Sequence, residues 1–118
     1  MSDQPEIKLI IEPISREEAR QIGEPWYTEL VKGVVDVERG IIALGGEWHM
    51  DANVRLMAEG SEQQNVWGFN IYVDRTGPEW IEFVSLINIR PTEGNRTLEI
   101  ESHELREAMR AHIERLIV

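Results

Sequence analysis

The stretch from Val66 to Val73 constrains the fold most, because large apolar side chains occupy every second position. The alternating residues are Trp67, Phe69, Ile71 and Val73. Successive side chains of a β-strand point to opposite faces, so this spacing predicts a strand with one face in the core. Its other face would carry Gly68, Asn70 and Tyr72. The stretch therefore predicts a sheet with one apolar face and one face that holds polar groups.

The rest of the chain supplies further strands and three helices. Additional strands are predicted at residues 7–11, 31–37, 41–49 and 80–90. Helices are predicted after a capping box at Ser15, after Asp51 as an N-cap, and after Ser102 at the final amphipathic stretch. Strands interrupted by helices predict an α+β fold with a single, mostly antiparallel sheet and helices packed on one face. The link from the 41–49 strand through the Asp51 helix would form one parallel crossover.

Length and composition indicate one domain spanning residues 1–118, with residues 1–6 as a flexible tail. A chain of this length buries enough surface to fold without a metal or disulfide staple. It has no cysteine, no basic and apolar leader, and no run near the roughly 20 apolar residues that span a bilayer. We therefore expect a cytoplasmic protein that does not enter membranes.

The charge balance argues against one class of partner. The chain carries 22 acidic against 12 basic residues, a net charge of -10. Such a field repels phosphate backbones, and no stripe of Lys and Arg interleaves with aromatic residues. We expect no nucleic-acid binding.

A first group of candidate site residues lies between Gly45 and Asp51. If the strand continues to His49, Glu47 and His49 share one face about 6.6 Å apart, and both are ordinary metal ligands. Asp51 would lie about 13 Å from Glu47, too far to share one ion, and is explained as a helix cap. Two such ligands do not predict a metal site, so we expect no metal or other cofactor and treat Glu47 and His49 as ligand-binding candidates.

A second group of candidates follows the 80–90 strand. It consists of Asn88, Arg90, Asn95 and Arg96, and Asn70 would join it on the polar face of the sheet. Arginine forks hold carboxylates or phosphates bidentately, so two Arg and two Asn in an acidic chain indicate an anion-binding patch. The alternative is that Arg90 and Arg96 pair with internal carboxylates, such as Glu47, Glu82 or Asp51, and only tie the loop down.

Three functions fit these residues. The favoured one is a binding module for a small anionic ligand or peptide, with Arg and Asn orienting the anion beside His49. The first alternative is a hydrolase-like or lyase-like enzyme with His49 as general base, oriented by Glu47 or Asp51. The second is a homodimeric interaction domain without a small-molecule site, joined through an open sheet edge or a face lined by tryptophans.

Several segments together resemble a family of short prokaryotic proteins known only as a domain of unknown function. They are Val35 to Glu38, Gly45 to Ala52, Glu59 to Gln64, Val66 to Gly68, Ser85 to Pro91, Asn95-Arg96 and Leu105-Arg106. The chain departs from the family at Trp48, where a smaller apolar residue is usual, and at Val84, where an acidic residue is common. The resemblance implies a cytosolic one-domain protein of bacterial or archaeal type and implies no activity, substrate or cofactor.

Overall fold

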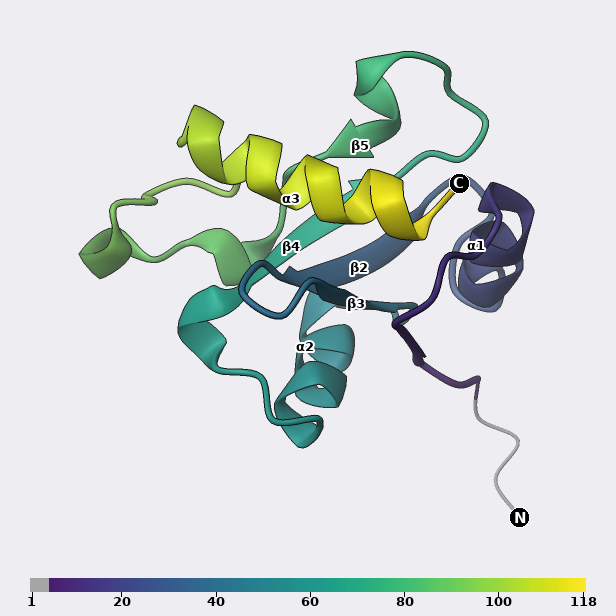
Figure 1. Ribbon diagram of the computed structural model, residues 1–118, viewed down its shortest axis with the longest axis horizontal. Helices are drawn as coiled ribbons and strands as arrows, with labels where there is room; N and C mark the ends of the chain where they lie inside the picture. Colours follow the sequence, from purple (N-terminus) through teal and green to yellow (C-terminus); the bar gives the residue numbers. More distant parts are fainter. Residues whose placement is uncertain (1–4) are drawn as a thin grey trace.

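A computed structural model describes residues 5–118 as a five-stranded sheet flanked by helices (Figure 1). The strands are β1 (Lys8–Ile10), β2 (Val31–Asp36), β3 (Ile41–Leu44), β4 (Val66–Ile71) and β5 (Ile81–Glu82). The helices are α1 (Arg16–Gly23), α2 (His49–Ala58) and α3 (His103–Leu116), with 3-10 turns η1 (Gln63–Asn65), η2 (Pro78–Trp80), η3 (Leu86–Asn88) and η4 (Pro91–Glu93). Residues 1–4 of the predicted flexible tail lie outside the described residues. None of the helices in the described part is long and apolar enough to cross a membrane.

The sheet confirms the predicted α+β class. Its strand order is β1-β3-β2-β4-β5, and all neighbouring strands are antiparallel. Because β3 and β4 are both antiparallel to the β2 strand between them, they run in the same direction. The predicted crossover from β3 through α2 to β4 is therefore present, and it passes over β2.

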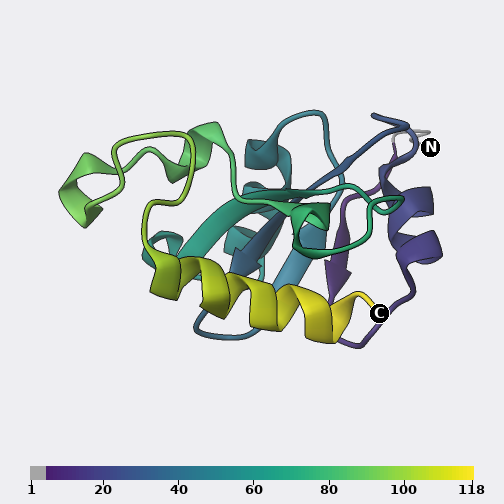
Figure 2. The ribbon, with the colours of Figure 1, turned by 90° about the horizontal axis from the view of Figure 1, so that it is seen from above.

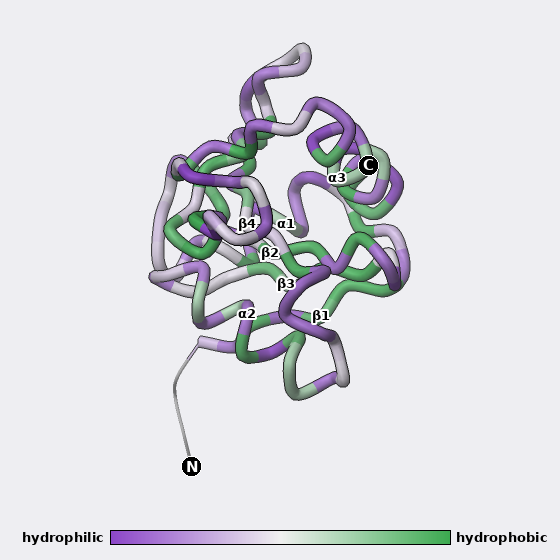
Figure 3. Tube along the Cα trace, turned by 90° about the vertical axis from the view of Figure 1, so that its left-hand side faces the viewer, coloured by the Kyte–Doolittle hydropathy of each residue, from purple (hydrophilic) through white to green (hydrophobic). Residues whose placement is uncertain are grey.

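Both faces of the sheet are covered. Val35 of β2 faces the larger core cluster, which includes residues of α1 and α3, so the prediction of helices on one face holds for these two. Val34 faces the opposite way and packs with Ala52 and Leu56 of α2. Figure 1 shows α3 in front of the sheet and α2 behind it. Nearly all residues of β2 and β3 are buried, whichever face their side chains point to, and Figure 3 colours most of these two strands as hydrophobic. Each face of the sheet therefore needs a cover.

The strand predicted to continue to His49 ends instead at Leu44. Gly45 and Gly46 adopt φ values of +114° and +102°, which breaks the extended backbone and which other residues rarely adopt. A Cβ atom at Gly45 would lie 2.8 Å from the Trp26 side chain, and one at Gly46 would lie 2.8 Å from Cβ of Asp51. The paired glycines therefore mark a close approach of the backbone to Trp26 and Asp51.

Helix α2 begins earlier than predicted, with Trp48 as N-cap and His49 as its first residue. Asp51 is not the N-cap but the third helical residue, and its carboxylate accepts a 3.0 Å hydrogen bond from the Trp48 N–H. A carboxylate in this position satisfies a free backbone donor and faces the positive end of the helix dipole. The caps at Ser15 and Ser102 are confirmed, since their side chains accept from the N–H groups of Glu18 and Leu105.

The strand predicted at 80–90 is also wrong for most of its length, because β5 ends at Glu82. Residues 83–100, which we call the wall segment, leave the sheet and extend beyond its end (Figure 2). Ser85 redirects the chain: its Oγ accepts a 3.2 Å hydrogen bond from the Ile87 N–H and caps the turn η3. The segment folds back on itself, and Ser85 N–H donates to the Leu98 carbonyl at 3.1 Å.

The wall segment packs so closely on β4 that Gly68 leaves no room for a methyl group. We expect Gly68→Ala to lower the free energy of unfolding by about 1–3 kcal/mol, because its Cβ would lie 2.6 Å from Cβ and 2.7 Å from Oγ of Ser85. Chemical denaturation measures this loss. Adding Ser85→Gly should recover part of it, and costs that simply add in the double variant would contradict the proposed contact.

Candidate functional site

A cavity of about 500 Å³ opens on the face of the sheet that α2 covers. Its floor includes Lys32 of β2 and Asn70 of β4, which are directly opposite each other in the sheet register. The N-terminal end of α2 forms one side and the wall segment forms the other. The remaining lining residues are Trp48, His49, Met50, Val84, Ser85, Leu86, Ile87 and Leu98. The fold thus brings together His49 and Asn70, two of the predicted site residues, from positions far apart in the sequence.

Hydrogen bonds fix the orientation of the His49 ring. Its Nε2 lies 2.9 Å from the Phe69 carbonyl and 2.9 Å from Oδ1 of Asn70. The Asn70 amide cannot be reversed without loss, because its Nδ2 donates to Glu82 at 2.8 Å and to the Val84 carbonyl at 3.3 Å. Both neighbours of Nε2 are therefore acceptors, so Nε2 carries the proton. The neutral ring then has its lone pair on Nδ1.

The buried position of His49 keeps its imidazole neutral. Burial, helped by the charge of Lys32, lowers the pKa of His49 to about 4. The hydrogen bonds to Phe69 and Asn70 oppose this shift without reversing it. Among the described residues Nδ1 makes no hydrogen bond and is not one of the fully buried polar atoms, and His49 lines the cavity. The site therefore presents an uncharged hydrogen-bond acceptor at neutral pH.

Lys32 supplies the charge of the cavity, and the sequence analysis did not select it. Its ammonium lies 5.3 Å from the centre of the Tyr27 ring, and it forms no ion pair within residues 5–118. No Asp or Glu belongs to the described lining of the cavity, although the chain as a whole is strongly acidic. The available signal was a cation inside the mostly apolar strand 31–37, on the same face as Val34 and Asp36.

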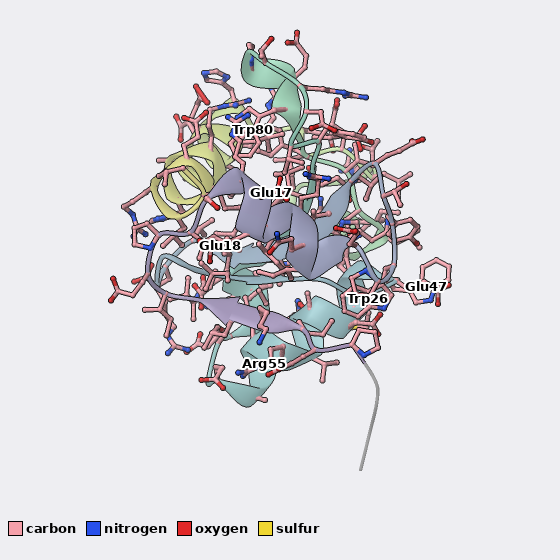
Figure 4. All side chains as sticks on the ribbon, turned by 90° about the vertical axis from the view of Figure 1, so that its right-hand side faces the viewer. Glu17, Glu18, Trp26, Glu47, Arg55 and Trp80 are labelled. Carbon is pink, nitrogen blue, oxygen red and sulfur yellow. The ribbon has the colours of Figure 1, made fainter. Side chains whose placement is uncertain are left out.

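Glu47 lies apart from His49. Its side chain is exposed at the periphery, close to Trp26 (Figure 4), while its backbone carbonyl accepts a 2.8 Å hydrogen bond from the Tyr27 hydroxyl. The predicted pairing of Glu47 and His49 depended on a strand that ends before them, so the two do not share a face. Within residues 5–118, no group of three or more His, Asp or Glu is placed to hold a metal ion.

The side chains of Asn88 and Arg90 donate hydrogen bonds to backbone carbonyls of β4. The carboxamide of the fully buried Asn88 donates to the Gly68 carbonyl at 3.0 Å and accepts from the Gly68 N–H at 2.8 Å. The Arg90 guanidinium donates to the Val66 carbonyl and stacks 3.9 Å over the Trp67 ring. Arg90 does not pair with Glu47, Glu82 or Asp51, but its guanidinium lies 3.9 Å from the carboxylate of Glu93 within the same loop. Both Asn88 and Arg90 take the place that a neighbouring strand would have beside β4.

Asn95 holds the wall segment together from within. Its Nδ2 donates to the carbonyls of Asn88 at 2.8 Å and Thr97 at 2.9 Å, and its Oδ1 accepts from the Glu101 N–H at 2.8 Å. Arg96 is exposed, and its backbone N–H donates to the Glu101 carboxylate at 2.7 Å. None of Asn88, Arg90, Asn95 and Arg96 lines the described cavity. The two predicted groups therefore meet directly through the hydrogen bond between His49 and Asn70, while the four residues of the loop remain outside the cavity.

The mouth of the cavity is rimmed by large apolar side chains. Trp48, Met50, Leu86 and Leu98 all line it, yet they are 59%, 51%, 69% and 42% exposed. Ser85 also lines the cavity but makes no hydrogen bond to His49 within the described residues. The arrangement offers an apolar enclosure, one cation and one neutral acceptor, without a nucleophile bonded to a base.

Comparison with known proteins adds a family. A family model described as "Protein of unknown function (DUF5674)" matches residues 8–116, which confirms the predicted resemblance. The comparison with curated proteins and the comparison with solved structures gave no match.

Asn88→Asp tests the role of Asn88 on β4. The aspartate keeps the shape of the side chain but loses the donor to the Gly68 carbonyl and adds a buried charge. We expect a loss of about 3 kcal/mol in the free energy of unfolding at pH 7, measured by urea denaturation. Asn65→Asp is the control, since Asn65 is half-buried and its carboxamide makes no hydrogen bond among the described residues. Equal losses in the two variants would count against the backbone role.

The lowered pKa of His49 predicts a dependence of stability on pH. Below its ordinary pKa of about 6.5 the unfolded state binds a proton that the folded state refuses until about pH 4. The contribution of His49 is therefore complete above pH 6.5, and about 2–4 kcal/mol of stability is lost as the pH falls to 4.

The measurement compares unfolding free energies of wild type and His49→Gln across this range. Wild type should lose more stability than the variant on acidification, while His103→Gln, which removes an exposed histidine, controls for loss of an imidazole. Parallel curves for wild type and His49→Gln would rule out the buried neutral ring.

Proposed function

The chain belongs to the family described as Protein of unknown function (DUF5674), and this description names no activity, so we propose a function from the residues of the cavity. The protein is a binding module for a small carboxylate with an apolar body. The carboxylate contacts the Lys32 ammonium, and the body occupies the apolar enclosure beneath the exposed rim.

One observation carries this proposal: the charged residue in the lining of the cavity has the opposite sign to the net charge of the chain. The protein has a net charge of -10, yet Lys32 is the charged residue of the described lining and forms no ion pair within residues 5–118. A cation that is half-buried and unpaired favours an anionic partner, because an ion pair in a partly desolvated site is weakly screened by salt.

The size and lining of the cavity support a small organic ligand over an inorganic ion. A volume of about 500 Å³ lies within the range of about 300–1,000 Å³ that is usual for small-molecule sites. Large side chains of α2 and the wall segment provide apolar contact area on opposite sides, with Met50 and Leu98 as examples. Burying apolar surface of a ligand there would contribute about 25 cal/mol per Å² before the costs of association.

The enzyme alternative receives less support from the same residues. A general base works best when its pKa lies near the working pH, and burial lowers the pKa of His49 to about 4. Its orienting partners are an amide and a carbonyl, at Asn70 and Phe69, and neither is a carboxylate that would stabilise an imidazolium.

The test is binding of a panel of carboxylates that vary in their bodies: hexanoate, octanoate, phenylacetate, 3-phenylpropionate and indole-3-acetate. We expect at least one to raise the melting temperature and to bind saturably by calorimetry. Lys32→Met keeps the side-chain stem and removes the charge, so its affinity for that acid should fall about tenfold or more. The matching primary amide should also bind more weakly than the acid.

Lys8→Met is the matched control, because Lys8 is the other lysine of the chain and lies on the exposed edge strand β1, where it pairs with Glu6. It should bind like wild type. The proposal is overturned if no acid of the panel binds at millimolar concentration, or if Lys32→Met and wild type bind equally.

A further inference from the structure

We propose that the preferred ligand is a carboxylate that also carries a hydroxyl or amide N–H group, which donates a hydrogen bond to Nδ1 of His49. This inference rests on the proposed function and adds a class of ligand to it. It follows from Nδ1 of His49, an accessible acceptor on a residue that lines the cavity. Its role as acceptor is fixed by the hydrogen bonds that Nε2 makes to residues of β4.

The first step is that Nδ1 cannot exchange its role with Nε2. Moving the proton to Nδ1 would leave the Nε2 lone pair facing the Phe69 carbonyl and Oδ1 of Asn70, both at 2.9 Å. Turning the Asn70 amide to compensate would set its oxygen against the Glu82 carboxylate and the Val84 carbonyl. The cavity side of the ring therefore stays an acceptor.

The second step is that a plain carboxylate has nothing to offer this acceptor. Carboxylate oxygens are acceptors too, and two facing lone pairs repel. Protonating the ring would remove the conflict, but burial and the neighbouring Lys32 both oppose that charge. Filling the cavity with an apolar group would instead strip Nδ1 of water without replacing the hydrogen bond. A donor on the ligand, close to its carboxylate, satisfies both Lys32 and His49.

The third step concerns the other polar lining groups, which do not take over this role. Oδ1 of Asn70 already accepts from His49, and its Nδ2 is bonded to Glu82. Oγ of Ser85 accepts from the Ile87 N–H, and its hydroxyl can both donate and accept, so it does not favour a ligand donor over a ligand acceptor. Nδ1 is therefore the side-chain nitrogen acceptor without a hydrogen-bond partner in the described lining. It favours ligands that carry a hydrogen-bond donor.

The experiment compares acids that differ only by a hydroxyl group. The pairs are 3-phenyllactate with 3-phenylpropionate, mandelate with phenylacetate, and 2-hydroxyoctanoate with octanoate. For wild type we expect the hydroxy acid of at least one pair to bind about tenfold more tightly by calorimetry. In His49→Met, which removes the Nδ1 acceptor, the ratio should fall below about twofold.

A second measurement uses wild-type protein and does not depend on how the variant folds. Nitrogen-15 NMR of the imidazoles should show His49 protonated at Nε2 in the free protein and in the complex with the hydroxy acid. A proton on Nδ1 in either state would overturn the inference, because the ring would then be a donor to the ligand carboxylate.

The two proposals fail in different ways. If none of the acids binds, the carboxylate-binding function is wrong and the inference falls with it. If acids bind through Lys32 but the members of every pair bind equally, the function stands and the inference about the donor group is overturned. Equal hydroxyl preference in wild type and His49→Met would likewise overturn the assignment to Nδ1.

Discussion

The outer edge of β4 is satisfied by side chains, and the shape of the cavity depends on that arrangement. β5 pairs with β4 only at Ile71 and Asn70. Beyond that point the carboxamide of Asn88 bonds both backbone groups of Gly68, and the guanidinium of Arg90 bonds the Val66 carbonyl. A full strand in this place would have continued the sheet. The side chains of Asn88 and Arg90 instead bond the backbone groups of β4 at this edge. The main chain of residues 83–100 can therefore leave the sheet and form a wall of the cavity, and these backbone groups of β4 still have partners.

Strand β4 also sets which nitrogen of the His49 ring carries the proton. Asn70 connects the Glu82 carboxylate to the His49 ring, so a residue of β5 helps to decide which nitrogen of the ring faces the cavity. Lys32 lies opposite Asn70 in the neighbouring strand. The polar groups of the site therefore come from rigid strands and the start of a helix, a placement that favours fixed geometry over adaptation.

Much of this architecture is predictable from local patterns, and the failures have identifiable causes. The alternation from Trp67 to Ile71 predicts β4 because burial on one face imposes a period of two. The strand expected through His49 fails because two glycines with positive φ end it, a choice that sequence leaves open. The prediction of a strand at 80–90 is wrong because β4 is bonded, beyond Asn70, by the side chains of Asn88 and Arg90 and not by a strand. This contact joins residues far apart in the sequence, so no local pattern indicates it. Lys32 was missed because a single charge within a strand has many explanations until its neighbours across the sheet are known.

The wall segment gives this fold a natural place to diverge. Its attachment relies on buried polar groups such as Asn88 and Asn95, whereas the side chains it turns toward the cavity mouth, Leu86 and Leu98, are largely exposed. Replacing Leu86 and Leu98 would change the shape of the cavity mouth while leaving the sheet, its register and the His49 ring in place. Chains with the same sheet could therefore accept ligands of different outline by changing a few residues that contribute little to folding.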